Sequence, residues 1–441
     1  MLQKVVLFWF RRDLRLDDNA GLFHALSSGY PVIPIFIFDS DMLSQLEDKD
    51  DKRVSFIHTA LQKIQQELQE VGATMDVRFG KPLSVLQQLL NDYDVNAVYT
   101  NHDYEPYAKE RDEKIQAFLT ANGISFYTFK DQVIFEKDEV SKDDGGGYMV
   151  YTPYAKRWRA LLNQMHYRPF ESHKLFSSFY KQQPLPLPGL KEMGFVYNST
   201  IPSIETVDET IVKHYDKTRD IPAIQGTTRM GIHLRFGTVS VRKLAAKALS
   251  LNNVYLSELI WREFFMQILW RHPRVVNEAC KKEYDNIKWR NNEDEFERWC
   301  EGKTGYPIVD AGMRELNATG FMHNRVRMIV GSFLVKDLLV DWRWGEAYFA
   351  RKLMDFELAS NNGNWQWVAG CGCDAAPYFR VFNPTIQAKK FDPQGLYIKK
   401  WIPELESFSY PRPIVEHDYA KQRCLAAYKA ALPRRELFAN K

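Results

Sequence analysis

Acidic, amide and indole side chains are concentrated in the segment 353–383, LMDFELASNNGNWQWVAGCGCDAAPYFRVFN. Acids and amides are seldom buried without hydrogen-bonding partners, so this mixture is unusual for a plain core helix. The side chains concerned are Asp355, Glu357, Asn361, Asn362, Trp365 and Trp367. Indoles beside polar groups favour a planar ligand that is hydrogen-bonded at its rim and stacked on its face. On a helix, residues two apart differ in direction by about 200°, so the two tryptophans are expected to point oppositely and to serve different purposes.

Two further segments place charged and apolar groups on one helix face. In ELIWREFF (258–265), helical spacing brings together Glu258, Trp261 and Arg262. These side chains could hydrogen-bond and stack a base, or they could be an exposed ion pair beside a core tryptophan. In MHNRVRM (322–328), the same spacing groups Asn324, Arg327 and Met328. Arg327 could pair with a nearby acid such as Asp355, because a buried guanidinium needs a well-placed carboxylate.

The segment GTTRMGIHLRFGTVS (226–240) places two hydroxyls beside a guanidinium between glycines, at Thr227, Thr228 and Arg229. Hydroxyls, a guanidinium and the N–H groups of a turn suit a pyrophosphate. The alternative is a helix that is N-capped by a threonine next to a surface arginine.

Composition limits the class of protein. A chain of 441 residues predicts two or three domains. No run of eighteen apolar residues exists and the N-terminus lacks a signal-peptide core, so we expect a cytoplasmic protein, most simply a monomer, without a membrane span. Five scattered cysteines favour reduced thiols over a disulfide framework, and no metal site is expected. The net charge is only +3, but residues 200–441 are modestly basic, which is compatible with a polyanionic partner and is weak evidence for one.

The order of apolar patterns predicts an α/β domain followed by a helical domain. Nearly continuous apolar runs predict strands at 5–10, 32–38, 75–79, 96–100 and 124–129, with helices at 54–72 and 106–123 between them. Strands that alternate with helices favour a doubly wound parallel sheet over residues 1–130. Residues 131–200 are rich in Gly, Pro and charges and are interpreted as a connector. Residues 201–441 have helical spacing and predict an all-α domain.

Taken together, these segments resemble the DNA photolyase/cryptochrome family, and within it the bacterial members that repair cyclobutane pyrimidine dimers. The resemblance runs from Val5 to about Leu405 and includes FWFRRDLRLDDN, GTTRMG, ELIWREFF, GYPIVDAGMRELNATGFMHNRVRMIV and LASNNGNWQW. It implies an N-terminal α/β antenna-type domain and a C-terminal helical domain that binds FAD. It also implies light-driven repair of UV-damaged DNA, with excited reduced FAD as the electron donor.

By position, the resemblance assigns roles to individual residues. The FAD-binding positions are Tyr215, Thr227, Thr228, Arg229, Met230, Gly231, Arg327, Asp355, Phe356, Glu357 and Asn361. The lesion pocket corresponds to Glu258, Trp261, Asn324, Met328 and Trp367, and a further catalytic position, Asn361, to the residue that faces flavin N5. The DNA-facing surface corresponds to Arg262, Phe265, Arg325 and Gln387. An electron relay from the flavin corresponds to Trp365, Trp342 and Trp289. Gly231 stands where many members have Ser, and Glu357 stands where Asp is usual.

Several alternatives stay open at this point. A second chromophore could be a folate, a deazaflavin or a flavin, and Ala108 stands where folate-binding members have Glu. A cryptochrome-type photoreceptor and a six-four photoproduct photolyase are the main rivals to dimer repair. A nucleotide-binding electron-transfer flavoprotein is the fallback if the family motifs are set aside. The motifs at Glu258, Trp261, Asn361 and Trp367 favour repair.

Overall fold

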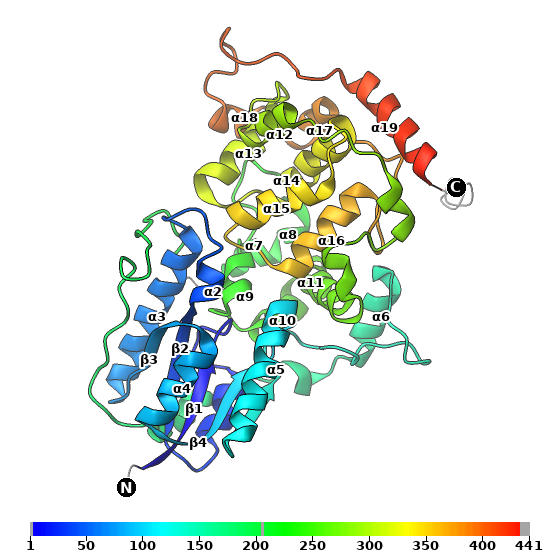
Figure 1. The fold of residues 1–441 in the computed structure, drawn as a ribbon. Coiled ribbons are helices and arrows are strands. Elements are labelled where there is room, and N and C mark those ends of the chain that lie inside the picture. Colours follow the sequence, from blue (N-terminus) through cyan, green and yellow to red (C-terminus); the bar gives the residue numbers. More distant parts are fainter. Residues whose placement is uncertain (1–2, 204–206, 433–441) are drawn as a thin grey trace. The chain divides into compact units, whose positions relative to one another are not determined.

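The chain forms two compact units in a computed structural model that describes residues 3–203 and 207–432 (Figure 1). The first unit takes its described residues from 1–136, 162–206 and 230–247, and the second takes them from 137–161, 207–229 and 248–441. The segment 131–200, predicted as a connector, therefore contributes to both units. It contains the helix α6 (Tyr151–Leu161) and the short 3₁₀ helices η1 (Gln164–Tyr167) and η2 (Ser172–Ser178).

A five-stranded parallel sheet organises the first unit, with strand order β3-β2-β1-β4-β5. The strands are β1 (Lys4–Phe10), β2 (Val32–Asp39), β3 (Asp76–Gly80), β4 (Asp94–Asn101) and β5 (Ser125–Phe129). Val6 pairs with Val32 and Val98 pairs with Phe126 in the parallel registers. All five strands occur where the apolar runs predicted them, and the doubly wound sheet followed by a helical unit is confirmed.

Helices cover both faces of this sheet, which explains why the strands are apolar throughout. Every residue of β2, and all but the first residue of β1, is buried. On one face, Leu7 and Trp9 share a core with Leu86 of α4 and Ile115 of α5. On the other face, α1 lies close to Phe8, whose side chain points the opposite way along the strand. The helices of this unit are α1 (Ala20–Leu26), α2 (Ser40–Leu43), α3 (Lys52–Glu70), α4 (Pro82–Asp92), α5 (Pro106–Ala121) and α9 (Gly231–Phe236).

The second unit is helical in its described residues. Its helices are α6, α7 (Glu209–Lys213), α8 (Tyr215–Thr218), α11 (Asn253–Arg271), α12 (Glu293–Cys300), α13 (Pro307–Thr319), α14 (Asn324–Ser332), α15 (Trp342–Lys352), α16 (Leu358–Ala369), α17 (Pro384–Phe391), α18 (Leu396–Trp401) and α19 (His417–Ala431). Short turns η3 (Pro273–Val276), η4 (Lys282–Asn286) and the π-helical η5 (Phe333–Asp337) join some of them, and α10 (Val241–Leu251) crosses from the first unit into the second.

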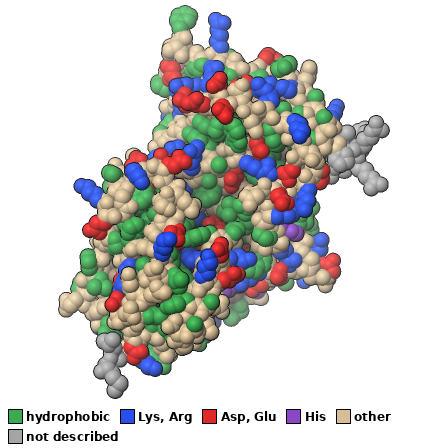
Figure 2. Space-filling model, in the orientation of Figure 1, with side chains coloured by type: hydrophobic (Ala, Val, Ile, Leu, Met, Phe, Trp, Pro, Cys, Tyr) green, Lys and Arg blue, Asp and Glu red, His purple; other side chains and the backbone are tan. Residues whose placement is uncertain are grey.

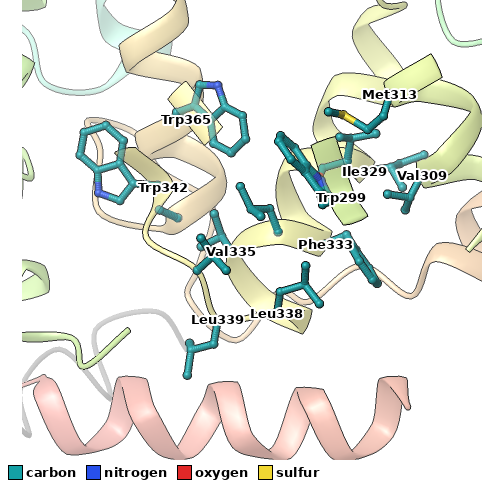
Figure 3. Packing of buried hydrophobic residues seen from close by; sticks show 14 of the residues in the cluster. Trp299, Val309, Met313, Ile329, Phe333, Val335, Leu338, Leu339, Trp342 and Trp365 are labelled. Atoms are coloured by element: carbon teal, nitrogen blue, oxygen red, sulfur yellow. The ribbon is translucent and has the colours of Figure 1, made fainter. Parts of the chain in front are cut away.

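A large apolar cluster forms the core of the second unit, with Trp299, Trp342 and Trp365 among its members (Figure 3). Lys336 of η5 is buried within this unit, and its ammonium group donates to the carbonyls of Ala369 and Tyr378 at 3.2 and 3.1 Å. Burial lowers the pKa of Lys336 to about 8. No helix in the described part of the chain is both long and apolar enough to cross a membrane.

Candidate functional site

A cavity of about 400 Å³ opens within the helical unit. Its size is within the range of small-molecule and cofactor sites. The helices α11, α14, α15 and α16 and the segment before α16 supply its walls. The predicted residues that line it are Glu258, Trp261, Arg262, Phe265, Asn324, Arg327, Met328, Asp355, Phe356, Glu357, Asn361, Trp365 and Trp367. Segments far apart in the sequence are thus brought to one site.

The indole of Trp261 forms an aromatic wall of the cavity and packs against two aromatic neighbours. Tyr151 of α6 stacks on it face to face, with ring centroids 3.6 Å apart and an interplanar angle of 4°. The Tyr151 hydroxyl donates to the carbonyl of Ser257 at 3.0 Å, which fixes the phenol ring. Phe265 lies 5.6 Å from Trp261 at a tilt of 30°. Sequence reasoning missed Tyr151, because no spacing rule connects α6 with α11.

Glu258 projects into the cavity from α11 and is paired with Arg219, a second lining residue that sequence reasoning did not identify. Withdrawal from solvent raises the pKa of Glu258, and the Arg219 guanidinium offsets only part of that effect. The nearby charge of Asp220 raises this pKa further. Glu258 is therefore a carboxyl group that can be neutralised more easily than an exposed glutamate.

Arg327 and Asp355 form the pair that the sequence predicted. The guanidinium Nη2 lies 2.8 Å from Asp355 Oδ2, and Nε donates to the carbonyl of Met322 at 2.8 Å. The other carboxylate oxygen, Asp355 Oδ1, is buried and has no hydrogen-bond partner in the described structure. A buried carboxylate oxygen without a partner is costly, so it marks a position at which a ligand donor would be stabilised.

Arg262 and Glu357 pair with each other, although the sequence placed one on a DNA-facing surface and the other at the cofactor. Arg262 Nη2 lies 2.8 Å from Glu357 Oε1, and Nε lies 3.0 Å from Oε2. Their side chains are only 10% and 6% exposed. Both residues line the cavity, and the longer arm of Glu357, relative to the usual aspartate, ends on this arginine. Ser360 also donates to Glu357, at 3.2 Å.

Helix α16 carries three of the predicted residues in different surroundings. The Asn361 amide donates to the backbone carbonyl and to a side-chain oxygen of Glu346, both at 3.1 Å. Trp365 is 4% exposed and packs edge-on against Phe349 at 4.9 Å. Trp367 is half-buried. The two indoles differ in burial, as expected if they point in opposite directions. Both nevertheless line the same cavity, so the prediction that they serve separate purposes agrees with the structure only in part.

The remaining predicted residues do not line the cavity. They are Tyr215, Thr227, Thr228, Arg229, Met230, Gly231, Arg325, Gln387, Trp342 and Trp289. Thr228 Oγ1 lies 3.1 Å from the Tyr255 hydroxyl, and the Tyr215 ring stands edge-on to Tyr255 at 5.1 Å. The residue that precedes α9 is Met230, which makes no side-chain cap, so the alternative of a threonine N-cap is wrong.

Arg325 and the two relay tryptophans that do not line the cavity, Trp342 and Trp289, contact residues elsewhere in the helical unit. Arg325 pairs with Asp220 at 2.8 Å and lies over the Phe391 ring at 4.4 Å. Trp342 is 1% exposed within the helical core, and Trp289 packs at its edge near Tyr428, with centroids 6.0 Å apart. Gln387 is half-buried on α17.

Comparison with known proteins places these features in one family. The model of the FAD binding domain of DNA photolyase matches residues 255–409, and the DNA photolyase model matches residues 6–174. A deoxyribodipyrimidine photo-lyase of Synechococcus sp. is 36% identical, with 97% of this chain and 97% of that protein covered.

Two solved structures share the whole fold. A bacterial class III photolyase from Agrobacterium tumefaciens superposes with a TM-score of 0.86 at 32% identity, covering 98% of both chains. An archaeal photolyase from Sulfolobus tokodaii, solved with two FAD molecules, has a TM-score of 0.78 at 36% identity and covers 96% of this chain and 99% of its own. With relatives this similar over nearly their full length, the chain belongs to the DNA photolyase family.

Proposed function

We propose that the protein is a light-driven lyase that splits cyclobutane pyrimidine dimers in DNA with FAD as its cofactor. The observation that carries the proposal is the cavity itself. It combines a buried carboxylate oxygen without a partner at Asp355, a carboxyl group of raised pKa at Glu258 and an indole wall at Trp261. The family to which the chain belongs supplies the reaction, and these residues supply the chemistry that it needs.

The residues present fit FAD. Asp355 Oδ1 can accept a hydrogen bond from a flavin ring N–H, while Arg327 holds the other oxygen of the same carboxylate. Asn361 and Phe356 would complete the flavin end of the site. The phosphates and ribose would be held by the predicted positions Tyr215, Thr227, Thr228, Arg229, Met230 and Gly231. When bound and reduced, FAD supplies the light-excited electron that splits the dimer.

The lesion would be held by the residues at the open side of the cavity. A cyclobutane dimer stacks poorly, so flipping it out of the duplex costs less than the usual few kcal/mol. Stacking on Trp261 and Trp367 would return about 1–3 kcal/mol per base. Glu258 would hydrogen-bond the base edge in its neutral or charged form, and Asn324 and Met328 would complete the pocket floor.

Contacts with the DNA backbone would come from outside this pocket. Arg325, Arg262, Phe265 and Gln387 remain the proposed DNA-facing positions. Arg325 is the better placed arginine, because its partner Asp220 is 42% exposed, whereas Arg262 is committed to a buried carboxylate. A phosphate could compete with Asp220 for Arg325.

The proposal also includes a second, light-harvesting chromophore and action as a monomer in the cytoplasm, where the DNA substrate lies. A folate, a deazaflavin and a second flavin remain the candidates for the chromophore. The Sulfolobus tokodaii photolyase carries two FAD molecules, which makes a second flavin a reasonable expectation. The absorption spectrum of the purified protein distinguishes the three.

Repair under blue light tests the function. Irradiated oligonucleotide is incubated with reduced holoprotein, and dimer loss is measured together with the absorption spectrum and the DNA affinity. Glu258→Ala should lower the repair yield on the order of 2- to 10-fold, because a charge-assisted hydrogen bond to the lesion is lost. Its effect on DNA affinity should be smaller.

Glu293→Ala is the matched control, because Glu293 is an exposed glutamate of α12 outside the cavity. It should repair as well as the wild type. Flavin-containing wild-type protein that leaves dimers intact in the light would contradict the proposed function. An unchanged yield in Glu258→Ala would remove only Glu258 from the mechanism.

A further inference from the structure

Two cysteines that are remote in sequence face each other inside the helical unit. Cys280 Sγ and Cys373 Sγ are 2.7 Å apart, and the residues are 9% and 7% exposed. Cys280 lies between η3 and η4, and Cys373 follows α16. A covalent S–S bond needs about 2.0 Å, so an approach of less than one ångström would join them.

The two chain segments that carry these thiols are both hydrogen-bonded to one residue of α16, Gln366. The Cys280 N–H donates to Gln366 Oε1 at 2.8 Å. The N–H groups of Cys371 and Gly372 donate to the Gln366 carbonyl at 3.0 and 3.1 Å. A Cβ atom at Gly372 would lie 2.9 Å from Gln366 Cβ, so only glycine lets this segment lie against the helix. The thiols therefore meet because the framework around them is fixed.

The electrostatic environment distinguishes the two sulfurs. Either sulfur can donate the hydrogen bond between them, and when Cys373 donates it lowers the pKa of Cys280. The nearby cations Arg274 and Lys281 lower the pKa of both thiols against the effect of burial. The pKa of Cys373 is raised, first by the same hydrogen bond and then by burial. Cys280 is therefore the more easily ionised thiol, and the thiolate is the reactive form.

The thiols of the other three cysteines ionise less easily than that of Cys280. Burial raises the pKa of Cys300 to about 12 and the pKa of Cys424 to about 11, and it raises the pKa of Cys371 as well. Cys371 makes long contacts to Gln366 and points toward that residue's oxygens. These thiols should remain reduced under mild oxidation.

We propose that Cys280 and Cys373 are a redox-sensitive pair that closes to a reversible disulfide on exposure to a peroxide. The Cys280 thiolate attacks one peroxide oxygen, the O–O bond breaks, and water leaves to give a sulfenic acid. The Cys373 sulfur then attacks Cys280 Sγ, the S–O bond breaks, and a second water carries away the Cys373 proton. Two thiols and one hydrogen peroxide thus give one disulfide and two waters. A dithiol reductant reverses the reaction by exchange.

The pair is connected to the wall of the cavity. Asp374, next to Cys373, accepts a hydrogen bond from the Tyr151 N–H at 3.2 Å, and Tyr151 stacks on Trp261. A disulfide would fix this segment to the turn before η4, because a cross-link restricts the motions that separate its ends. The expected physical result is slower amide exchange in residues 370–378 of the oxidised protein.

Peptide mapping of the intact holoprotein tests the pair directly. The protein is treated with hydrogen peroxide, free thiols are alkylated, and the digest is analysed by mass spectrometry. The expected product joins the Cys280 peptide to the Cys373 peptide, with the loss of two hydrogen masses and full recovery after dithiothreitol. Hydrogen exchange of residues 370–378 is compared between the two forms.

Three variants make the test specific. Cys371→Ser, the matched control two residues away, should still form the cross-link. Cys373→Ser should stop at a sulfenic acid on Cys280 that dimedone labels, and Cys280→Ser should form neither product. A cross-link through Cys371, or oxidation of Cys300 while Cys280 and Cys373 both remain alkylatable, would overturn the proposal. The wild-type map decides the pairing even if a variant does not fold, and none of these readouts depends on repair activity.

Discussion

Among single residues, each carboxylate that lines the cavity forms an ion pair with an arginine. Glu258 pairs with Arg219, Asp355 with Arg327, and Glu357 with Arg262. Removing a charge from water costs free energy unless the charge is paired and hydrogen-bonded. The arginines therefore offset the cost of burying three carboxylates in one cavity. The three pairs differ in whether a carboxylate oxygen is left to accept a hydrogen bond from a ligand. Asp355 keeps a buried oxygen without a partner, whereas both oxygens of Glu357 are engaged by Arg262.

Replacement of Arg262 should therefore lower the free energy of unfolding more than replacement of an arginine whose partner is exposed. Arg262→Ala would leave the Glu357 carboxylate, which is 6% exposed, without its bidentate partner. The expected loss is about 3–5 kcal/mol of unfolding free energy. It is measured as a shift of the urea midpoint, followed by circular dichroism.

The matched control for this prediction is Arg325→Ala. Arg325 also pairs with an aspartate at 2.8 Å, but that partner, Asp220, is 42% exposed. Its loss should cost about 0.5–2 kcal/mol, because water replaces the contact with Asp220 while the contact with the Phe391 ring is lost. Equal midpoints for the two variants would show that burial of the Arg262–Glu357 pair contributes nothing.

At the scale of elements, the site depends on how helices begin and how closely they pack. Helix α14, which carries Asn324 and Arg327, is capped by His323, whose Nδ1 accepts from the Arg325 N–H at 3.2 Å. Acceptance at Nδ1 requires a neutral ring with its proton on Nε2. Burial lowers the pKa of His323 to about 4, and the charges of Arg327 and Arg325 act in the same direction. Helix α15 approaches α16 closely because Gly345 leaves room for the Trp365 ring, which a Cβ atom would meet at 2.2 Å.

The His323 cap predicts a pH dependence of stability. Its folded pKa is about 4 and its unfolded pKa is about 6.5. Between about pH 6.5 and pH 4, the unfolded chain binds one more proton at this histidine than the folded protein does. The contribution of His323 to the free energy of unfolding is therefore complete above about pH 6.5, and it is lost as the pH falls to about 4. The contribution is on the order of 3 kcal/mol.

His323→Asn is the variant that isolates this effect, because asparagine caps a helix without titrating. Urea midpoints at about pH 7 and pH 4.5 should differ less in His323→Asn than in the wild type. The exposed His214 provides the control, since its side chain makes no cap hydrogen bond and His214→Asn should leave the wild-type pH dependence unchanged. The same pH dependence in wild type and His323→Asn would assign the acid sensitivity to other groups.

At the scale of the whole molecule, the chain separates a sheet-based unit from a helical unit that contains the entire cavity. All three tryptophans of the predicted relay also belong to the helical unit, and two of them, Trp365 and Trp342, are fully within its core (Figure 3). The net charge of the chain is only +3, and on the visible face basic and acidic side chains are interspersed (Figure 2). A net charge this small favours the proposal that DNA is bound through particular arginines, such as Arg325.

The relay predicts that photoreduction and repair can be separated. Trp365→Phe removes the indole that lines the cavity and packs into the core, while it keeps an aromatic ring in its place. Photoreduction of the bound FAD in the presence of an external donor should slow on the order of tenfold or more, because phenylalanine is far harder to oxidise. Repair by chemically reduced protein should change little. Both rates are followed by absorption spectroscopy and dimer loss.

Trp401→Phe is the control for this comparison. Trp401 is another partly buried tryptophan that packs against the same core, on α18, and it does not line the cavity. Its replacement should leave photoreduction unchanged. Wild-type photoreduction in Trp365→Phe would remove Trp365 from the relay.

Most local elements, and membership of the family, could be predicted from the sequence alone. The apolar runs predicted all five strands, because strands buried on both faces must be apolar throughout. Helices α1, α2 and α4 of the same unit were not predicted. The pairing of Arg327 with Asp355 was predictable because both residues belong to motifs with a recognisable pattern.

The pairing of side chains that are distant in the sequence became visible only in the folded protein. Glu258 and Arg219 are 39 residues apart, Arg262 and Glu357 are 95 apart, and Cys280 and Cys373 are 93 apart. Periodicity and spacing describe a residue's direction from its own helix, not the partner that another helix brings to it. The choice of partner depends on how helices pack, because burial of a charge or a thiol selects the neighbour that compensates for lost water.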